Sequence, residues 1–272
     1  MKWILILIVI AAIFMTACVD KPESIKKAYD YTLNGENGEI DLTINISDAY
    51  FNRPTPNGCD ECYKNKEKPL AANKSCGQCF QDYINDPISE QYIEALAFEI
   101  QNKTSNDDDQ LRIAISMVQH IPYDTPYSHN LGSRSQKYPV DVLYTDTGVC
   151  QEKSLLLAAI AKKLGYNVSI LTFYPENHMT VGIATNLRQS WYGENGGYTL
   201  VETNFPAITT MRLHYDENFN NGVNYLQSQP IVIPLTSSGK SWDNISTEMH
   251  DAQYTNCSYI KWKYGLYNSY CM

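Results

Sequence analysis

One cysteine, one histidine and one glutamate in this sequence have the residue types that nucleophilic acyl transfer requires. A thiolate is favoured where unpaired backbone N–H groups and the positive end of a helix dipole surround the sulfur, and Cys150 lies at the predicted start of a helix. A histidine must then reach the sulfur, and a third group must hold the imidazole in the useful tautomer. His178 and Glu202, on predicted strands further along the chain, supply these two types.

The same three residues also fit a purely structural interpretation. In that case Cys150 is a buried small hydrophobe, His178 a turn histidine paired with a neighbour, and Glu202 a surface charge. Spacing alone does not separate the two interpretations, because many chains contain such a triple. The remaining histidines have no comparable context: His120, His129, His214 and His250.

An acyl-transfer intermediate also needs two hydrogen-bond donors for its oxyanion. The backbone N–H of Cys150 is one natural candidate. Tyr138 and Gln151 are both candidates for the second donor, and the sequence does not choose between them.

Four further cysteines form two C-x2-C pairs separated by 13 residues: Cys59, Cys62, Cys76 and Cys79. Two such turns can present four thiolates to one tetrahedral ion, which predicts a structural zinc site without a catalytic role. Two disulfides are the alternative, because an exported protein allows them. We favour zinc, since the polar, Lys-rich loop lacks a core of its own. A thiol-disulfide exchanger is disfavoured by the absence of a βαβ pattern around either pair.

The elements that must position the candidate catalytic residues follow one another along the chain. A helix is predicted from residue 148 through Leu164, ending at Gly165, and because it is apolar almost all round it should be central. Three strand-like runs follow, separated by turn-forming segments: residues 168–174, 179–184 and 198–202. A helix followed by a strand meander predicts an α+β fold.

The rest of the chain shows weaker patterns. Residues 39–46 alternate so that one face carries Ile40, Leu42, Ile44 and Ile46, which predicts a half-buried strand. Helical spacing of apolar residues predicts two helices, one capped by Ser89 and one that begins at Ser105 and ends before Pro122. Residues 123–147 are predicted as loop, and residues 231–235 as a last strand.

Five segments, in this order, resemble the prokaryotic transglutaminase-like family: residues 138–143 (YPVDVL), 148–157 (GVCQEKSLLL), 164–168 (LGYNV), 178–182 (HMTVG) and 198–204 (YTLVETN). The resemblance runs from about residue 118 to residue 204. It implies a papain-like core in which the nucleophile heads a helix that packs against an antiparallel sheet, and the sheet bears the base and its partner. By this resemblance Cys150 takes the position of the nucleophile, His178 that of the base and Glu202 that of the carboxylate.

The sequence departs from the family pattern at the carboxylate. The better-known animal enzymes have Asp at this position, and Glu202 is one methylene longer. Either the strands are spaced accordingly, or Asn204 orients the histidine instead. We favour Glu202, because it directly precedes Thr203 as the family pattern has it.

The first residues have the pattern of an export signal. Lys2 is followed by an apolar run at residues 3–15, too short for a permanent membrane helix of about 20 residues. Residues 15–18 (MTAC) resemble a prokaryotic lipobox, which implies that residues 1–17 are removed and that Cys18 carries a lipid. The alternatives are an ordinary secretory signal and an uncleaved anchor. The lipobox predicts a protein anchored by its lipid to the outer face of the membrane, at the cell envelope.

Composition limits the partners of the chain. The formal net charge of the 272 residues is −9 and no window is rich in Lys and Arg, so nucleic-acid binding is disfavoured. The 21 tyrosines concentrate partly in the tail from Tyr254 to Tyr270, where they suit either an envelope-facing binding surface or a core edge. Cys257 and Cys271 in this tail either pair with each other or remain free.

These predictions define four parts of the chain: a signal peptide (1–17), an N-terminal segment with the four-cysteine loop (19–88), a transglutaminase-like domain (89–235) and a Tyr-rich tail (236–272). The expected function is that of a cysteine-dependent amide hydrolase or acyltransferase that acts on a protein or peptide amide through a thioester and needs no cofactor for catalysis. The alternative is an inactive transglutaminase-like domain that serves as an envelope binding module.

Overall fold

The computed structural model of this protein describes residues 23–49, 53–56, 59, 76–130, 135–186, 197–207, 213–215, 223–242 and 263. The helices are α3 (Cys76–Ile84), α4 (Pro87–Lys103), α5 (Asp107–His120), α6 (Thr125–Ser128), α7 (Pro139–Thr145) and α8 (Cys150–Lys163). The strands are β1 (Ser24–Leu33), β2 (Glu36–Asn45), β3 (Val168–Phe173), β4 (His178–Ala184), β5 (Tyr198–Val201), β6 (Leu213–Tyr215), β7 (Val223–Tyr225) and β8 (Ile231–Pro234). The described residues therefore form an α+β fold.

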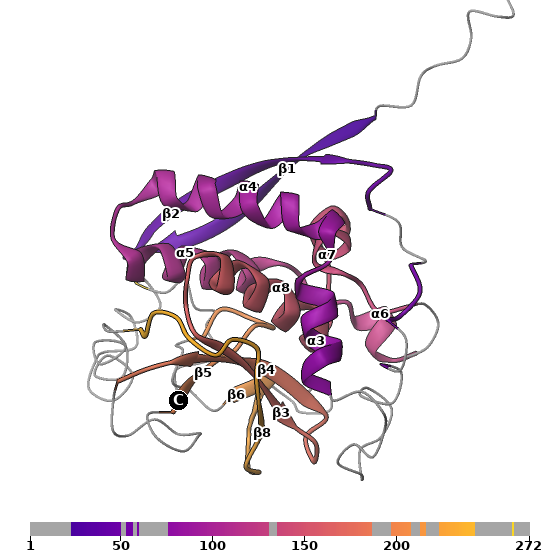
Figure 1. The fold of residues 1–272 in the computed structure, drawn as a ribbon, viewed down its shortest axis with the longest axis vertical. Helices are drawn as coiled ribbons and strands as arrows, with labels where there is room; N and C mark the ends of the chain where they lie inside the picture. The colour runs from indigo at the N-terminus through magenta and orange to yellow at the C-terminus, as the bar shows by residue number, and fades with distance from the viewer. Residues whose placement is uncertain are drawn as a thin grey trace, which may run out of the picture.

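The elements are arranged in layers around α8. The hairpin β1–β2 and α4 lie on one side, α5 and α8 lie in the middle, and the sheet lies on the other side (Figure 1). The sheet has the order β5-β4-β3-β8, and all its neighbouring strands are antiparallel. As predicted, helices pack on an antiparallel sheet, and α8 follows the predicted bounds closely.

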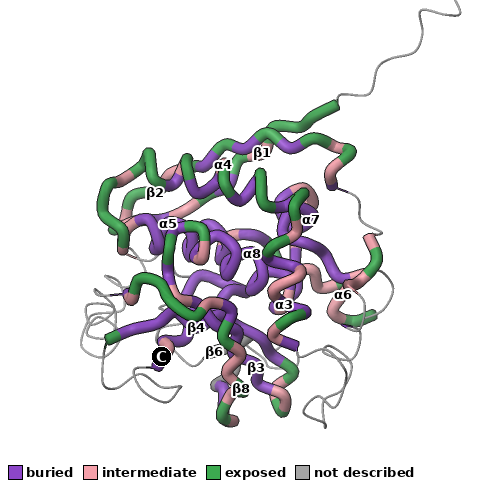
Figure 2. Tube along the Cα trace, viewed as in Figure 1, coloured by how far each residue is buried: buried purple, intermediate pink, exposed green. Residues whose placement is uncertain are grey.

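Helix α8 is the centre of the core. Eleven of its residues, from Cys150 to Ala161, are buried, which confirms the prediction made from its apolar composition. Figure 2 shows buried chain on the neighbouring helices and strands around it. The positive charges of Lys162 and Lys163 in the last turn complement the negative end of the helix dipole. Gly165, just after the helix, has a φ of 91°, a conformation that residues with a side chain rarely adopt.

The N-terminal hairpin contributes to the same core. Ile40, Leu42 and Ile44 of β2 are buried, as the alternating pattern predicts, and they belong to one hydrophobic cluster with α4, α5, α8 and the sheet. The cluster therefore extends across residue 88, where the sequence placed a domain boundary. Strand β1 was not predicted, although the Asn34-Gly35 turn that joins it to β2 is a strong hairpin signal; both residues have positive φ, 51° and 85°.

The starts of two helices differ from the predictions. Asp86 rather than Ser89 caps α4, because its carboxylate accepts the Ser89 N–H at 2.8 Å and Pro87 suits the first helical position. Asn106 rather than Ser105 caps α5, with its side-chain oxygen accepting the Asp109 N–H at 3.0 Å.

Two predicted irregular segments contain helices. Residues 123–147, predicted as loop, contain α6 and α7. Helix α7 begins at Pro139, and the N–H of the preceding residue, Tyr138, donates a hydrogen bond to Asp141 Oδ2 at 3.0 Å. In the cysteine-bearing segment, α3 begins at Cys76 and also carries Cys79. The short lengths of these helices give little periodicity to recognise.

The three described cysteines of the predicted zinc site are disulfide-bonded. Cys59 and Cys79 are bonded to each other, with 5.5 Å between their Cα atoms, and Cys76 is also disulfide-bonded. The zinc prediction is therefore wrong for these three residues in this structure, since a sulfur in a disulfide has no thiolate to offer a metal ion. Cys62 lies outside the described residues. The bridge joins the two C-x2-C pairs rather than closing either one, unlike the disulfide expected of a C-x2-C exchanger.

Removal of this bridge should cost measurable stability. We expect Cys59→Ser/Cys79→Ser to lower the free energy of unfolding by about 3 kcal/mol, because the disulfide constrains a chain segment of about 20 residues in the unfolded state. Urea unfolding in non-reducing buffer measures the loss, and Cys150→Ala, which removes a cysteine outside this bridge, is the control. Free thiols at Cys59 and Cys79 with stoichiometric zinc in protein purified without chelator would contradict the bridge.

Other cysteine and membrane predictions fall elsewhere in the chain. Residues 1–17, Cys18, Cys257 and Cys271 lie outside the described residues. None of the helices in the part of the chain that the structure describes has both the length and the apolar character of a membrane span. Among the described side chains, no group of three or more His, Cys, Asp or Glu residues is placed to hold a metal ion.

Candidate active site

The structure brings the three candidate catalytic residues together. Cys150 is the first residue of α8, His178 is the first residue of β4, and Glu202 directly follows β5. His178 Nε2 lies 2.8 Å from Glu202 Oε2, and the Cys150 side chain lies close enough to the His178 ring to help raise its pKa. Since Nε2 faces Glu202, the other ring nitrogen, Nδ1, is left for the sulfur. All three residues are buried, so this contact network is closed off from most solvent.

A buried glutamate next to Cys150 defines the start of α8. Glu152, which is fully buried, accepts the Val149 N–H at Oε2 (3.1 Å) and the Lys137 N–H at Oε1 (2.8 Å). Both N–H groups belong to residues that precede the helix, so the carboxylate ties the incoming chain to the first turn. The sulfur of Cys150 is thereby held at the positive end of a 14-residue helix.

His178 is held by the turn that precedes it. The Glu176 carboxylate in this turn accepts the backbone N–H groups of Gln227 and Ser228 at 2.8 and 2.7 Å. Burial alone would raise the pKa of Glu176, but these hydrogen bonds and the one from the Ser228 hydroxyl lower it. The β3–β4 turn is therefore fastened to the segment that leads into β8, and His178 pairs with Phe173 across the two strands.

Glu202 is held as a carboxylate by groups on several sides. Its Oε1 accepts the N–H groups of Thr203 and Asn204, both at 2.8 Å, and Oε2 faces His178. The Gln119 side chain donates to the Glu202 carbonyl at 2.8 Å. Burial raises the pKa of Glu202, but His178 and the two backbone N–H groups together lower it below its ordinary value.

The pKa of His178 shifts in the direction opposite to that of Glu202. Burial lowers the pKa of His178, but the Glu202 charge and hydrogen bonds with Cys150 and Glu202 outweigh it and raise the pKa above the ordinary value. The structure also resolves the choice between Glu202 and Asn204. Glu202 makes the contact with the ring, whereas Asn204 contributes its backbone N–H to Glu202. The longer side chain of Glu, in place of Asp, reaches the imidazole from a position directly after β5.

The two candidates for the second oxyanion donor are placed differently. The Tyr138 hydroxyl donates to the Pro54 carbonyl at 3.1 Å, and the ring lies 3.9 Å from the Arg53 guanidinium. Its hydroxyl is therefore engaged with the N-terminal segment. Gln151 lies next to Cys150 in the first turn of α8 and is partly exposed, so it remains the candidate that can turn toward a bound acyl group.

A fourth ionisable residue near this site was not singled out from the sequence. Lys153 lies three residues after Cys150 in α8 and is fully buried. Its Nζ donates to the backbone carbonyls of Ile121 and Asn204 at 2.5 and 3.2 Å. A lysine inside a helix that is apolar almost all round, on the same face as the candidate nucleophile, is the sequence signal that identifies it.

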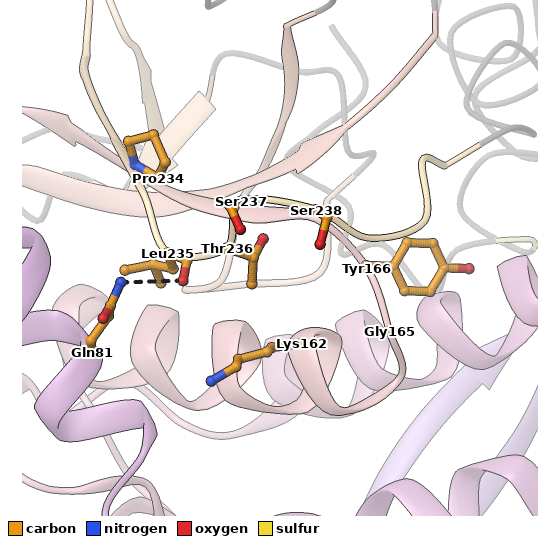
Figure 3. Close-up of a pocket in the computed structure, with 9 residues that line it drawn as sticks. All are labelled: Gln81, Lys162, Gly165, Tyr166, Pro234, Leu235, Thr236, Ser237 and Ser238. Atoms are coloured by element: carbon orange, nitrogen blue, oxygen red, sulfur yellow. Dashed lines mark hydrogen bonds between the residues drawn. The ribbon is translucent and has the colours of Figure 1, made fainter.

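A separate pocket lies at the other end of α8. It has a volume of about 610 Å³ and is lined by Gln81, Lys162, Gly165, Tyr166 and residues 234–238 (Figure 3). Helix α8 spans about 20 Å between the two regions at 1.5 Å per residue. The pocket therefore does not serve Cys150. Gln81, which donates to the Leu235 carbonyl at 3.4 Å, closes one of its sides.

Comparison with known proteins gives one family match and one similar solved structure. Residues 94–203 match the family model of the transglutaminase-like superfamily core, a range that contains all three candidate residues. The comparison with curated proteins gives no match. Among solved structures, a chain described as a "putative protease from Parabacteroides distasonis" is similar at 13% sequence identity, with a TM-score of 0.31. The similarity covers 80% of this chain but only 41% of that chain. From the match of residues 94–203 to the family model, this chain contains a transglutaminase-like superfamily domain.

Proposed function

We propose that this protein is a cysteine-dependent amide hydrolase or acyltransferase in which Cys150 is the nucleophile, His178 the base and Glu202 the residue that orients the base. One observation carries the proposal: a buried imidazole bonds at one nitrogen to a carboxylate at 2.8 Å and lies beside a cysteine at a helix N-terminus, close enough for the cysteine to help raise the pKa of the imidazole. This combination gives the sulfur a proton acceptor and fixes the acceptor's orientation.

The reaction proceeds in two balanced steps. The Cys150 thiolate attacks the carbonyl carbon of an amide, the C–N bond breaks, and His178 gives its proton to the departing amine. A thioester on Cys150 remains. Water or a second amine then attacks this thioester while His178 accepts its proton, which releases an acid or a new amide and restores the Cys150 thiolate and the protonated His178. Glu202 stabilises the imidazolium in both steps and needs no proton of its own.

Two groups are suited to the oxyanion that forms during each attack. The backbone N–H of Cys150 lies at the start of α8, where N–H groups have no partner within the helix. The Gln151 side chain is the second proposed donor, because it is adjacent and partly exposed. No metal ion takes part in this scheme.

The substrate class and the location are part of the same proposal. A protein or peptide amide is the expected substrate, and the cell envelope is the expected location. The location rests on residues 1–18, whose pattern of a signal followed by Cys18 favours a lipid-anchored protein. In a Triton X-114 separation the unaltered protein should enter the detergent phase, and a Cys18→Ser variant should leave it. A variant that stays in the detergent phase would argue against the lipid anchor.

The proposed reaction can be tested by trapping its intermediate. The protein is mixed with a peptide pool, quenched in acid and examined by intact-mass and peptide mass spectrometry. We expect acyl adducts on the peptide that contains Cys150, and we expect hydroxylamine to remove them, as it does thioesters. Addition of a fluorescent primary amine then separates transfer, which labels the peptides, from hydrolysis. Absence of any adduct, with no enhanced alkylation of Cys150, favours the binding-module alternative.

A further inference from the structure

The buried ammonium of Lys153 has no role in the two-step scheme above. Lysine is almost never fully buried in proteins unless it is paired, because removal of its charge from water is costly. Here the side chain crosses the core from α8 and ends at two carbonyl oxygens, those of Ile121 after α5 and Asn204 after β5. This position links the nucleophile's helix to the segment that carries Glu202.

Lys153 is connected to the candidate catalytic residues on two sides. Residues three apart in a helix share a face, with about 5–6 Å between their Cβ atoms, so Lys153 lies beside Cys150. On the other side, Nζ binds the Asn204 carbonyl while the Asn204 N–H binds Glu202 Oε1 at 2.8 Å. The ammonium is therefore close to both the thiol and the carboxylate.

The charges of the site balance only when Lys153 is included. A Cys150 thiolate and a His178 imidazolium cancel each other, which leaves the single negative charge of fully buried Glu202. An uncompensated charge in a protein interior is strongly unfavourable. Relying on the function proposed above, we propose that Lys153 is a positioning residue whose buried ammonium neutralises Glu202, so that the thiolate–imidazolium pair can persist in a closed interior.

The groups around Lys153 are consistent with this role. Burial lowers the pKa of Lys153, and the negative charges of Glu202, Asp146 and Cys150 oppose the decrease, with the result at about 7. The ammonium is thus present in acid and is lost as the pH rises through neutrality. Asp146, at the end of α7, also faces Lys27, whereas Glu202 faces His178 and Lys153.

The sign of the expected effect follows directly. A nearby positive charge favours a thiolate over a thiol, so removal of the charge should make Cys150 less reactive in acid. Lys153→Met removes the charge and keeps a long apolar side chain. The rate of Cys150 alkylation by iodoacetamide is measured as a function of pH, and the acid limb is the part of this curve where the rate falls as the pH is lowered. We expect this acid limb to move to higher pH by about one unit or more, which slows alkylation about tenfold at a fixed acidic pH. The difference should shrink above neutral pH, where Lys153 itself loses its proton.

Two variants separate this charge effect from lost packing. Lys153→Arg keeps a positive charge and should keep the acid limb at the wild-type pH. Lys137→Met is the matched control, because Lys137 is also buried and binds the Thr147 carbonyl at 2.9 Å, but it has its own carboxylate partner, Asp124, at 2.9 Å. It should lower the melting temperature and leave the acid limb in place. An acid limb unchanged in folded Lys153→Met overturns the inference, as does an equal shift in Lys137→Met.

A second measurement does not depend on the folding of a Lys153 variant. The pKa of Lys153 is read from the carbon-13 shift of its Cε as the pH is varied. In Glu202→Gln this pKa should fall by about one unit or more, because the carboxylate that supports the ammonium is gone. In Glu152→Gln it should stay at the wild-type value. Equal pKa values in the wild type and Glu202→Gln overturn the inference.

Failure of this inference can be distinguished from failure of the proposed function. If Cys150 of the unaltered protein is alkylated only near pH 8.5, like an ordinary thiol, then no thiolate is stabilised and both proposals are wrong. If the unaltered protein reacts well below that pH and Lys153→Met does the same, the proposed function stands and only the role of Lys153 is overturned.

Discussion

Cys150→Ala should abolish the amide chemistry of this protein. We expect a loss of about 10⁴-fold or more in kcat/KM, because the substitution removes the atom that forms the thioester and leaves only binding and the oxyanion donors. The stability should change little, since a small buried side chain is replaced by a slightly smaller one. Peptide-amide hydrolysis and amine incorporation measure the loss, and thermal unfolding verifies the fold.

Alkylation kinetics provide the control for this prediction. Iodoacetamide should modify Cys150 of the unaltered protein at pH 6 much faster than it modifies a cysteine in an unstructured peptide, since a helix N-terminus and a neighbouring imidazolium favour a thiolate. Full amide activity in Cys150→Ala, or alkylation no faster than that of the peptide, would contradict the role of the sulfur. The second result, together with no activity in the unaltered protein, is what the binding-module alternative predicts.

Glu202→Gln should cost nearly as much as removal of the nucleophile. Gln has almost the same shape but no charge, so it can neither stabilise the imidazolium nor fix the correct tautomer as a carboxylate does. A decrease of about 10³–10⁴-fold in kcat is expected. The matched control is Glu152→Gln, because Glu152 is also fully buried and also binds two backbone N–H groups, but it does not contact His178. Glu152→Gln should lower stability and reduce kcat far less.

The pH dependence gives Glu202→Gln a distinctive signature. The Glu202 charge raises the pKa of His178, so its removal lowers the pH at which the imidazolium loses its proton. The alkaline limb of the activity profile should therefore move to lower pH, opposite in direction to the shift expected for Lys153→Met. An alkaline limb at the same pH in Glu202→Gln and the unaltered protein would show that the carboxylate does not control the histidine.

The sequence predicted those elements whose pattern is long or strongly apolar. The buried helix α8 and the strands around His178 were recognised from composition and spacing, and so was the alternation of β2. Helices α6 and α7 were missed, because 4 and 7 residues are too few for a periodic pattern. The caps at Asp86 and Asn106 were assigned to neighbouring residues, since Asp, Asn and Ser are all favourable caps and only the three-dimensional contacts separate them.

The site was predicted less evenly. The resemblance pointed to Cys150, His178 and Glu202, which the structure places close together, and the catalytic roles remain predictions. The zinc prediction was wrong for Cys59, Cys76 and Cys79. A C-x2-C spacing suits thiolate ligands and disulfides equally well, and the fold brings Cys59 to Cys79. Lys153 was missed because its importance depends on complete burial, which a single lysine in a sequence does not reveal.

The N-terminal hairpin limits how the protein can be shortened. A fragment that begins at residue 89, where the sequence suggested a domain start, would leave uncovered the surface of α4 that contacts β2 and the surface of α5 that contacts β1. It would also lose the hydrogen bonds from Tyr29 to the Leu143 carbonyl and from the Thr32 N–H to Ser116. Recombinant versions and crystallisation targets should therefore start upstream of residue 23, and fusion partners are better attached before β1 than between β2 and α4.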